Sequence, residues 1–89
     1  MDITISVVFK GGSGLLKAKL FHDGAIADSG QTNSSATPIT LNGASSGDEI
    51  GIDGVSPPAG TDVTIDVSTA PPTPKSYPGG PIMDVFFIN

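Results

Sequence analysis

The sequence contains no cysteine, no tryptophan and no arginine. Without cysteine the chain can form no disulfide, no zinc–thiolate site and no cysteine nucleophile. The absence of arginine leaves four lysines against nine acidic residues, which gives a formal net charge of −5. Nucleic-acid binding depends on clustered basic residues that contact phosphates, so this composition argues against it. The same deficit argues against docking on an anionic membrane surface.

Long hydrophobic runs are also absent. No stretch approaches the roughly 20 apolar residues that a membrane-spanning helix requires, so membrane insertion is not expected. The first residues lack the basic, apolar and small-residue layout of a signal peptide. A composition rich in Ser, Thr, Gly, Asn and Asp and free of Arg nevertheless favours a secreted or cell-surface location, and a cytoplasmic one stays open.

Short runs in which apolar and polar residues alternate make up most of the chain, and no window has a sustained helical period. Because side chains on a strand switch faces at every residue, such runs predict half-buried β-strands. Strands are expected within residues 2–9, 15–22, 25–29, 37–41, 49–53, 62–67 and 82–88. The expected core consists of Ile3, Ile5, Val7, Phe9, Leu16, Leu20, Ile39, Leu41, Ile50, Ile52, Val63, Ile65, Val67 and part of 82–88.

Turn signals separate these runs. Asp23-Gly24 is typical of a two-residue hairpin, whereas the prolines of residues 69–81 predict an extended loop without a regular element. Short strands with turns every 8 to 12 residues or so are the pattern of an all-β sandwich or barrel. We therefore predict one domain over residues 1–89, an antiparallel β-sandwich of about seven strands with Greek-key connections.

Two runs near the middle of the chain each carry one apolar and one acidic face, and the glycines and prolines between them predict either a hairpin or a crossover from one sheet to the other. If residues 49–53 and 62–67 pair antiparallel, the carboxylates of Asp53, Asp62 and Asp66 converge. Calcium takes six to eight oxygen ligands, so these residues are the candidate metal site and calcium the candidate cofactor. The other interpretation, which we favour, is a solvated acidic face that keeps the protein soluble and needs no cofactor.

Two motifs have the form of catalytic groups. Residues 43–47 match G-x-S-x-G with Ser45 at the nucleophile position, and His22 stands beside Asp23. A nucleophile elbow needs a helix after the serine and a histidine with an acid nearby, and no helix is expected here. His22 at a hairpin end is more typical of a half-solvated side chain. The chain is therefore predicted not to be an enzyme.

The last predicted strand is apolar on both faces apart from Asp84. Phe86, Phe87 and Ile88 cannot all face one core because neighbouring side chains alternate. They are the candidate interface for a protein partner or a second copy of the chain. Tyr77 is the candidate ligand-binding residue, since an exposed ring can stack on a glycan; alternatively, it covers the core.

Residues 14–24 form an alternating strand with a glycine-containing chain reversal, and Ser-Gly-Asp-Glu-Ile-Gly-Ile follows at 46–52. These segments resemble the transthyretin-like (prealbumin-like) and related immunoglobulin-like modules of bacterial surface proteins. The chain lacks the tryptophan and cysteine pair of antibody-type domains. The resemblance implies a non-catalytic extracellular or cell-surface module with a structural or interaction role. The alternative is a small module that binds glycan or calcium.

Overall fold

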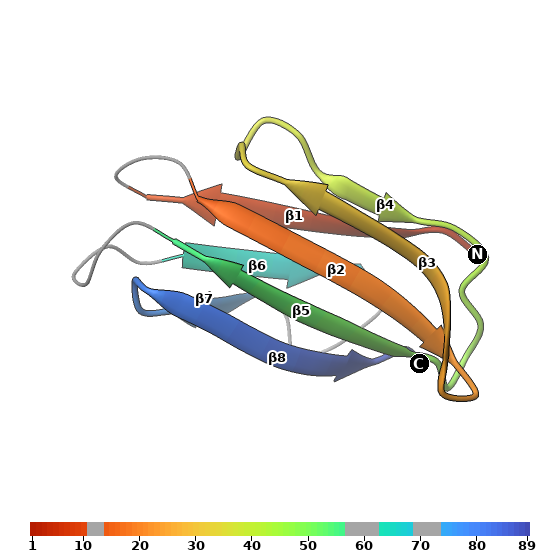
Figure 1. The fold of residues 1–89 in the computed structure, drawn as a ribbon. Helices are drawn as coiled ribbons and strands as arrows, with labels where there is room; N and C mark the ends of the chain where they lie inside the picture. The colour runs from red at the N-terminus through yellow and green to blue at the C-terminus, as the bar shows by residue number, and fades with distance from the viewer. Residues whose placement is uncertain (11–13, 57–62, 69–73) are drawn as a thin grey trace.

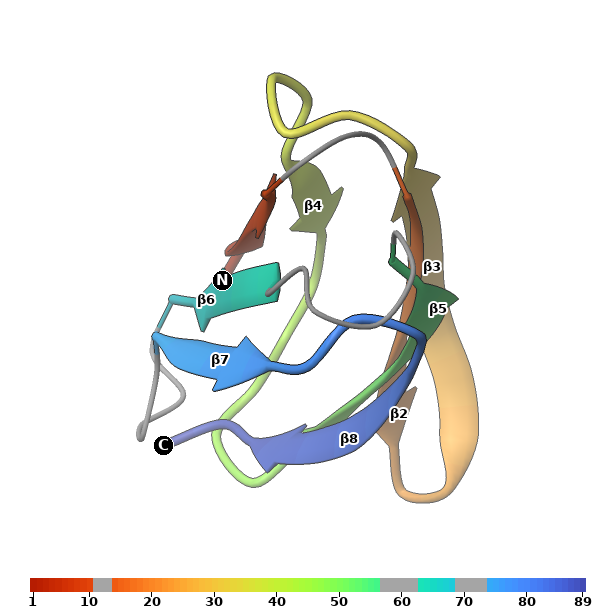
Figure 2. The ribbon, with the colours of Figure 1, turned by 90° about the vertical axis from the view of Figure 1, so that its left-hand side faces the viewer.

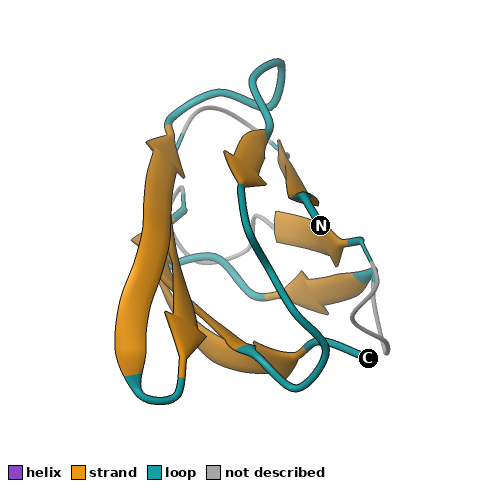
Figure 3. Ribbon diagram, turned by 90° about the vertical axis from the view of Figure 1, so that its right-hand side faces the viewer, coloured by secondary structure: helices purple, strands orange, loops and turns teal. Residues whose placement is uncertain are grey.

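The computed structural model of the protein describes residues 1–10, 14–56, 63–68 and 74–89. Within these ranges all regular structure is β-strand, and no helix is present (Figures 1 and 3). The strands are β1 (Ile3–Phe9), β2 (Leu15–His22), β3 (Ala25–Thr32), β4 (Ile39–Leu41), β5 (Glu49–Val55), β6 (Val63–Val67), β7 (Lys75–Tyr77) and β8 (Pro81–Phe87). The described part of the chain therefore offers no helix that is long and apolar enough to cross a membrane.

The strands form two four-stranded sheets in which every pair is antiparallel. Sheet A has the order β4-β1-β6-β7, and sheet B has the order β3-β2-β5-β8. Figure 2 shows the two layers from the side, with sheet B on the right. The all-β prediction is confirmed in this sandwich-like arrangement, and the described residues contain eight strands rather than about seven.

The additional strand lies in the proline-rich segment. The sequence predicts no regular element over residues 69–81, but Lys75–Tyr77 pairs with Val63–Ile65 of β6. The flanking Pro74 and Pro78 limit this strand to three residues without preventing it, because an edge strand tolerates proline at its ends. Residues 69–73 lie outside the described part of the chain.

The two central runs do not pair with each other. β5 pairs with β2 and β8 in sheet B, whereas β6 pairs with β1 and β7 in sheet A. The chain therefore crosses from one sheet to the other between them. Alternation of residue type predicts which side chains point inward, but it does not specify the partner strand. The antiparallel pairing that would bring the acidic faces together is thus wrong.

One hydrophobic core fills the space between the sheets. Every residue predicted for it is buried, and Ile82, Phe86 and Ile88 come from the last segment. Ala18 and Ala44 are buried in addition. Burial of these apolar side chains is the main favourable contribution to folding and explains why inward positions are occupied mostly by Ile, Val and Leu.

Segments far apart in the sequence meet at one end of the molecule, on the right in Figure 1. Gly47 N–H donates to the Ile88 carbonyl over 2.8 Å, and Ile88 N–H donates to the Asp48 carbonyl over 2.9 Å. Ala44 N–H donates to the Met1 carbonyl over 2.8 Å. These hydrogen bonds hold the loop before β5 against both ends of the chain.

Replacing Ile65 with alanine tests the core. Ile65 is fully buried on β6, so Ile65→Ala is expected to lower the free energy of unfolding by about 2–5 kcal/mol. Val8→Ala, on the exposed face of β1 in the same sheet, should change it by no more than about 0.5 kcal/mol. Urea denaturation measures both, and equal losses would contradict the assignment of inward and outward faces.

Candidate functional site

The outer faces of the two sheets differ in chemistry. Sheet A presents mainly small hydroxyl residues, among them Thr4, Ser6, Thr40 and Ser76. Sheet B presents a patch of exposed apolar side chains, here named the apolar strip, which consists of Leu15, Val55, Met83, Val85 and Phe87. Met83 is 83% exposed and Phe87 is 62% exposed. An apolar patch of this kind usually marks an interaction site.

Met83, Val85 and Phe87 follow one another along the outer face of β8, and Pro81 at the start of that strand connects them to Val55 and Leu15. In sheet B, Leu15 pairs with Val55, which pairs with Pro81. A surface hollow of about 290 Å³ lies at this end and is lined by Leu15, Lys17, Asp53, Val55, Pro81 and Met83, among others. Gly54 belongs to the same lining, and a Cβ on it would lie 2.1 Å from the Leu15 carbonyl oxygen. The strands thus approach closely where only glycine fits.

Four charged side chains share this face with the apolar strip. Lys17 and Lys19 point outward from β2, and Glu49 and Asp53 point outward from β5. Lys17 lies opposite Asp53, and Lys19 lies opposite Gly51. A Cβ on Gly51 would lie 3.3 Å from the Phe21 ring, so this ring packs beside Gly51 on the outer face. The outer face of sheet B therefore combines apolar side chains with equal numbers of positive and negative ones.

β8 is an edge strand, so one row of its backbone groups has no strand partner. Ser56 N–H donates to the Gly80 carbonyl, and Ile88 N–H donates to the Asp48 carbonyl, so the even-numbered residues direct their backbone groups towards β5. Because these groups alternate along a strand, those of Met83, Val85 and Phe87 point to the open edge. Pro81, on the same side, has no N–H to leave unpaired.

Asp84 closes the middle of this edge. One of its carboxylate oxygens accepts the Val85 N–H over 2.8 Å. The other accepts both Lys75 Nζ and Tyr77 Oη over 2.7 Å each, which links β8 to β7 of the other sheet. Burial would raise the pKa of Asp84, but the hydrogen bonds from Lys75 and Tyr77 outweigh it and lower the pKa. Burial, followed by the bond to Asp84, raises the pKa of Tyr77.

Asp28 has the same role on β3, the other edge of sheet B. Its carboxylate accepts the Ser29 N–H over 2.9 Å and the Asn42 N–H over 2.7 Å, the latter just after β4 of sheet A. The Asn42 bond is the main cause of the lowered pKa of Asp28. β3 also has an irregular register opposite Leu20 and Phe21. An inward carboxylate and a bulge are both known protections of edge strands.

The edges of sheet A are short. β4 and β7 contain three residues each, with Pro38 before β4 and Pro74 and Pro78 around β7. Short strands and proline prevent another chain from extending a sheet. All four edges among the described strands are thus unfavourable for strand addition.

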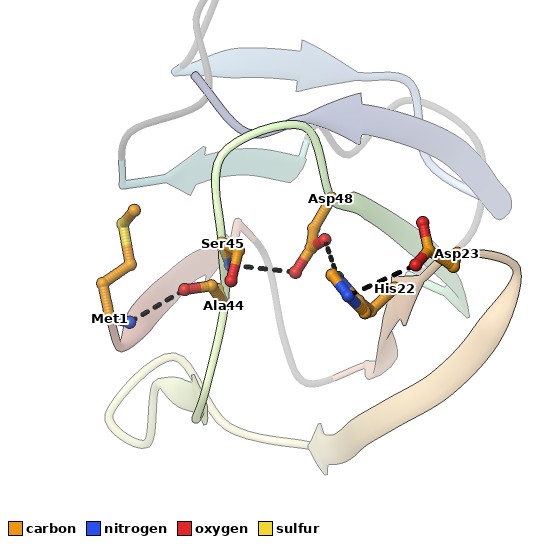
Figure 4. Close-up of polar contacts among 6 residues, drawn as sticks. All are labelled: Met1, His22, Asp23, Ala44, Ser45 and Asp48. Atoms are coloured by element: carbon orange, nitrogen blue, oxygen red, sulfur yellow. Dashed lines mark hydrogen bonds and ion pairs between the residues drawn. The ribbon is translucent and has the colours of Figure 1, made fainter.

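A polar cluster occupies the end of the molecule where the chain segments meet (Figure 4). His22 Nδ1 donates to Asp48 Oδ1 over 2.6 Å, and the other oxygen of Asp48 accepts the Ser45 N–H over 2.9 Å. His22 Nε2 lies 3.5 Å from Asp23 Oδ2. Asp48 is only 4% exposed, whereas the His22 side chain is 56% exposed. The cluster ties the β2–β3 hairpin to the loop before β5.

The two central members of this cluster shift each other's pKa. The hydrogen bond to Asp48, followed by the charges of Asp48 and Asp23, raises the pKa of His22 above its ordinary 6.5. The hydrogen bonds from His22 and Ser45 lower the pKa of Asp48 below its ordinary 3.8. Both shifts favour a charged pair, which is an arrangement that stabilises a loop.

Of these groups, the sequence drew attention to Ser45, His22 and Asp23 but not to Asp48. Ser45 contributes its backbone N–H to Asp48, and no strand-to-helix turn follows it in the described chain. The signal that could have pointed to Asp48 is Ser-x-x-Asp with a glycine before the aspartate. Gly47 has a φ of 90°, which a turn of this kind requires.

The structure describes two of the three candidate metal residues, and it does not bring these two together. Asp53 lies on the outer face of sheet B and Asp66 on the outer face of sheet A. Asp62 lies outside the described residues. Within the described ranges, no group of three or more His, Asp or Glu side chains is placed to hold a metal ion.

The remaining candidates have clear positions. Tyr77 is half-buried, packs against the core and bonds Asp84 through its hydroxyl. Lys75 Nζ lies 5.4 Å from the centre of its ring. Phe86 and Ile88 are buried in the core, whereas Phe87 is exposed on the outer face of sheet B. Of the three predicted interface residues, Phe87 is the one that a partner can reach.

No family model, no curated protein and no solved structure matches this chain. The chemistry of its own surfaces therefore carries the functional argument.

Replacing Asp84 with alanine removes the acceptor of the Val85 N–H. Hydrogen exchange of the Val85 amide should accelerate about tenfold, because a hydrogen bond to a charged group contributes roughly 1.5–3 kcal/mol. Light scattering should also detect faster aggregation, since the edge of β8 is then open. Asp2→Ala, at an exposed position before β1, is the control. Unchanged exchange at Val85 would refute the protective role of Asp84.

The His22–Asp48 pair makes stability depend on pH. Because the folded-state pKa of His22 is raised, its contribution is fully present below pH 6.5 and is lost as pH rises through the folded-state pKa. The lowered pKa of Asp48 gives a contribution that is present above pH 3.8 and lost on further acidification. The melting temperature should therefore fall as pH rises above 6.5. His22→Gln should abolish that fall, and parallel curves for the two proteins would contradict the assignment.

Proposed function

We propose that the protein is a non-catalytic structural or interaction module that binds a protein partner through the outer face of sheet B. The observation that carries this proposal is the apolar strip. Six of the eight large hydrophobic side chains exposed in the described residues belong to sheet B: Leu15, Ile26, Val55, Met83, Val85 and Phe87. Their concentration on one sheet favours a covered surface over scattered exposure.

The form of the strip fits a protein partner. Met83, Val85 and Phe87 form a row on β8, and Leu15 with Val55 extends it across the sheet. The charged side chains lie on the central strands β2 and β5 beside this row, so a partner on this face meets apolar and charged groups together. The protected edges disfavour partners that add a strand and favour one that packs on the face.

The polar cluster supports a structural role for the groups that resemble catalytic ones. Both oxygens of Asp48 are engaged, one by His22 and one by the backbone of Ser45. Within the described residues, no hydroxyl group is hydrogen-bonded to His22. No observation among these residues favours the glycan or calcium alternative.

Three finer assignments belong to the same proposal. The connections are of Greek-key type, which is supported by the return of β5 to the side of β2 after the chain has passed through β3 and β4. The module is immunoglobulin-like or transthyretin-like, on the resemblance of residues 14–24 and 46–52. It acts outside the cell or on its surface, on the composition of the chain.

Photo-crosslinking tests whether a protein covers this face. Met83 is replaced by benzoylphenylalanine, which its high exposure should tolerate. Irradiation of cells that express the variant should give adducts heavier than the single chain. The control carries the same group at Thr40, an exposed position on the outer face of sheet A. That control should give none.

Adducts with a second copy of the chain and adducts with another protein both support an interaction face. The absence of adducts at Met83, or equal yields at both positions, would refute the proposed function. A melting curve for each variant confirms that the fold is retained.

A further inference from the structure

The identity of the partner can be argued from the outer face of sheet B, if the proposed function holds. This face carries two lysines and two carboxylates, Lys17, Lys19, Glu49 and Asp53, and so has no net charge. The whole chain has a net charge of −5, so the remaining surface carries all of the excess. Two copies therefore approach each other with least repulsion through this face.

The register of the two central strands makes the face complementary to itself. β2 and β5 lie side by side, with Leu15 opposite Val55 and Lys17 opposite Asp53. A two-fold axis that runs between these strands, parallel to them and just above the face, exchanges the two columns. Each β2 side chain then lies over the β5 residue of the same row in the other copy, as a two-fold interface requires.

This superposition brings opposite charges together at Lys17 and Asp53 and apolar side chains together at Leu15 and Val55, whereas Met83 faces Gln31 and Val85 faces Ser29. Leu15 meets Val55 of the second copy, and Lys17 meets Asp53. Lys19 meets Gly51, beside which the Phe21 ring of the same chain lies, and Phe21 meets Glu49 of the second copy. On the outer strands, Ile26 of β3 faces Phe87 of β8, because each shares a row with Phe21 and Glu49.

We infer that the partner is a second copy of this chain, packed face to face through sheet B about this two-fold axis. Each contact occurs twice in the dimer. The protected edges of β3 and β8 explain why the copies stack rather than extend one sheet. Four strands of seven or eight residues cover about 19 by 25 Å. That area is small compared with the roughly 800 Å² per partner of a standard interface, so the dimer is weak and reversible.

Charge exchange at Lys17 and Asp53 tests the inference. Sedimentation velocity of the wild-type protein, from micromolar to millimolar concentration, should show a monomer–dimer equilibrium. Lys17→Glu and Asp53→Lys should each raise the dissociation constant roughly tenfold, because two close pairs per dimer change from attraction to repulsion. Lys10→Glu and Asp2→Lys make the same charge changes off the face and should leave it unchanged.

An equimolar mixture of the two variants is the decisive sample. In the mixed dimer, the glutamate introduced at position 17 of one copy faces the lysine introduced at position 53 of the other. At the second pair, the native Asp53 faces the native Lys17, so attraction is restored at both pairs. The double variant with both changes in one chain should also dimerise. Loss of stability cannot produce this pattern, since a variant that failed to fold would not recover on mixing.

Every other outcome rejects the inference. A wild-type protein that stays monomeric at millimolar concentration excludes the second copy as partner. A dimer that is indifferent to the charge changes, or variants that do not recover when mixed, places the contact elsewhere. The proposed function has its own test, because adducts at Met83 with a different protein would support it while the dimer fails.

Discussion

Burial of one face of every strand between two sheets is the constraint on which this protein depends. A chain of 89 residues has few apolar side chains to spare, and those on the inward positions of β1, β2, β5 and β6 form two thirds of the core. The alternation that supplies them leaves the outward positions free to vary. In sheet A the outward positions are occupied mainly by hydroxyl residues. In sheet B they are occupied by the apolar strip and four charged residues. The difference between the two outer faces is therefore not imposed by folding, and it is the strongest indication of function.

Two open sheets have four edges, and each one can template the addition of another chain. Neighbouring prolines and a length of three residues are enough to protect the edges formed by β4 and β7 against such addition. The longer edges of sheet B need more, and the same arrangement recurs on both: Asp28 and Asp84 each accept the N–H of the following residue and reach across to sheet A. Each carboxylate thus protects an edge and joins the two sheets at once. With association through the edges suppressed in this way, the proposed partner packs on the face of sheet B.

Several features of the site could be read from residue types, and others could not. Lys17 and Lys19 alternate with apolar residues, which marks an outward face, and the double apolar character of residues 82–88 pointed to a second contact surface. Phe86 and Ile88 proved to be core residues, because the strand parity that separates them from Phe87 depends on where β8 joins sheet B. Asp48 was not recognised as the partner of His22, since 26 residues separate them and only the closure of one end of the sandwich brings them together.

The sequence by itself determined the strands other than β7 and the inward side chains, because the two-residue period of a strand is a local property that each segment carries independently. It also excluded a basic binding surface and cysteine chemistry, since those depend on composition alone. The tertiary structure decided which strands are neighbours. It separated Asp53 from Asp66, placed Lys17 beside Asp53, and brought Asp84 to Lys75 and Tyr77. These relations depend on crossings between the sheets, and a local pattern contains no information about how two distant segments are paired.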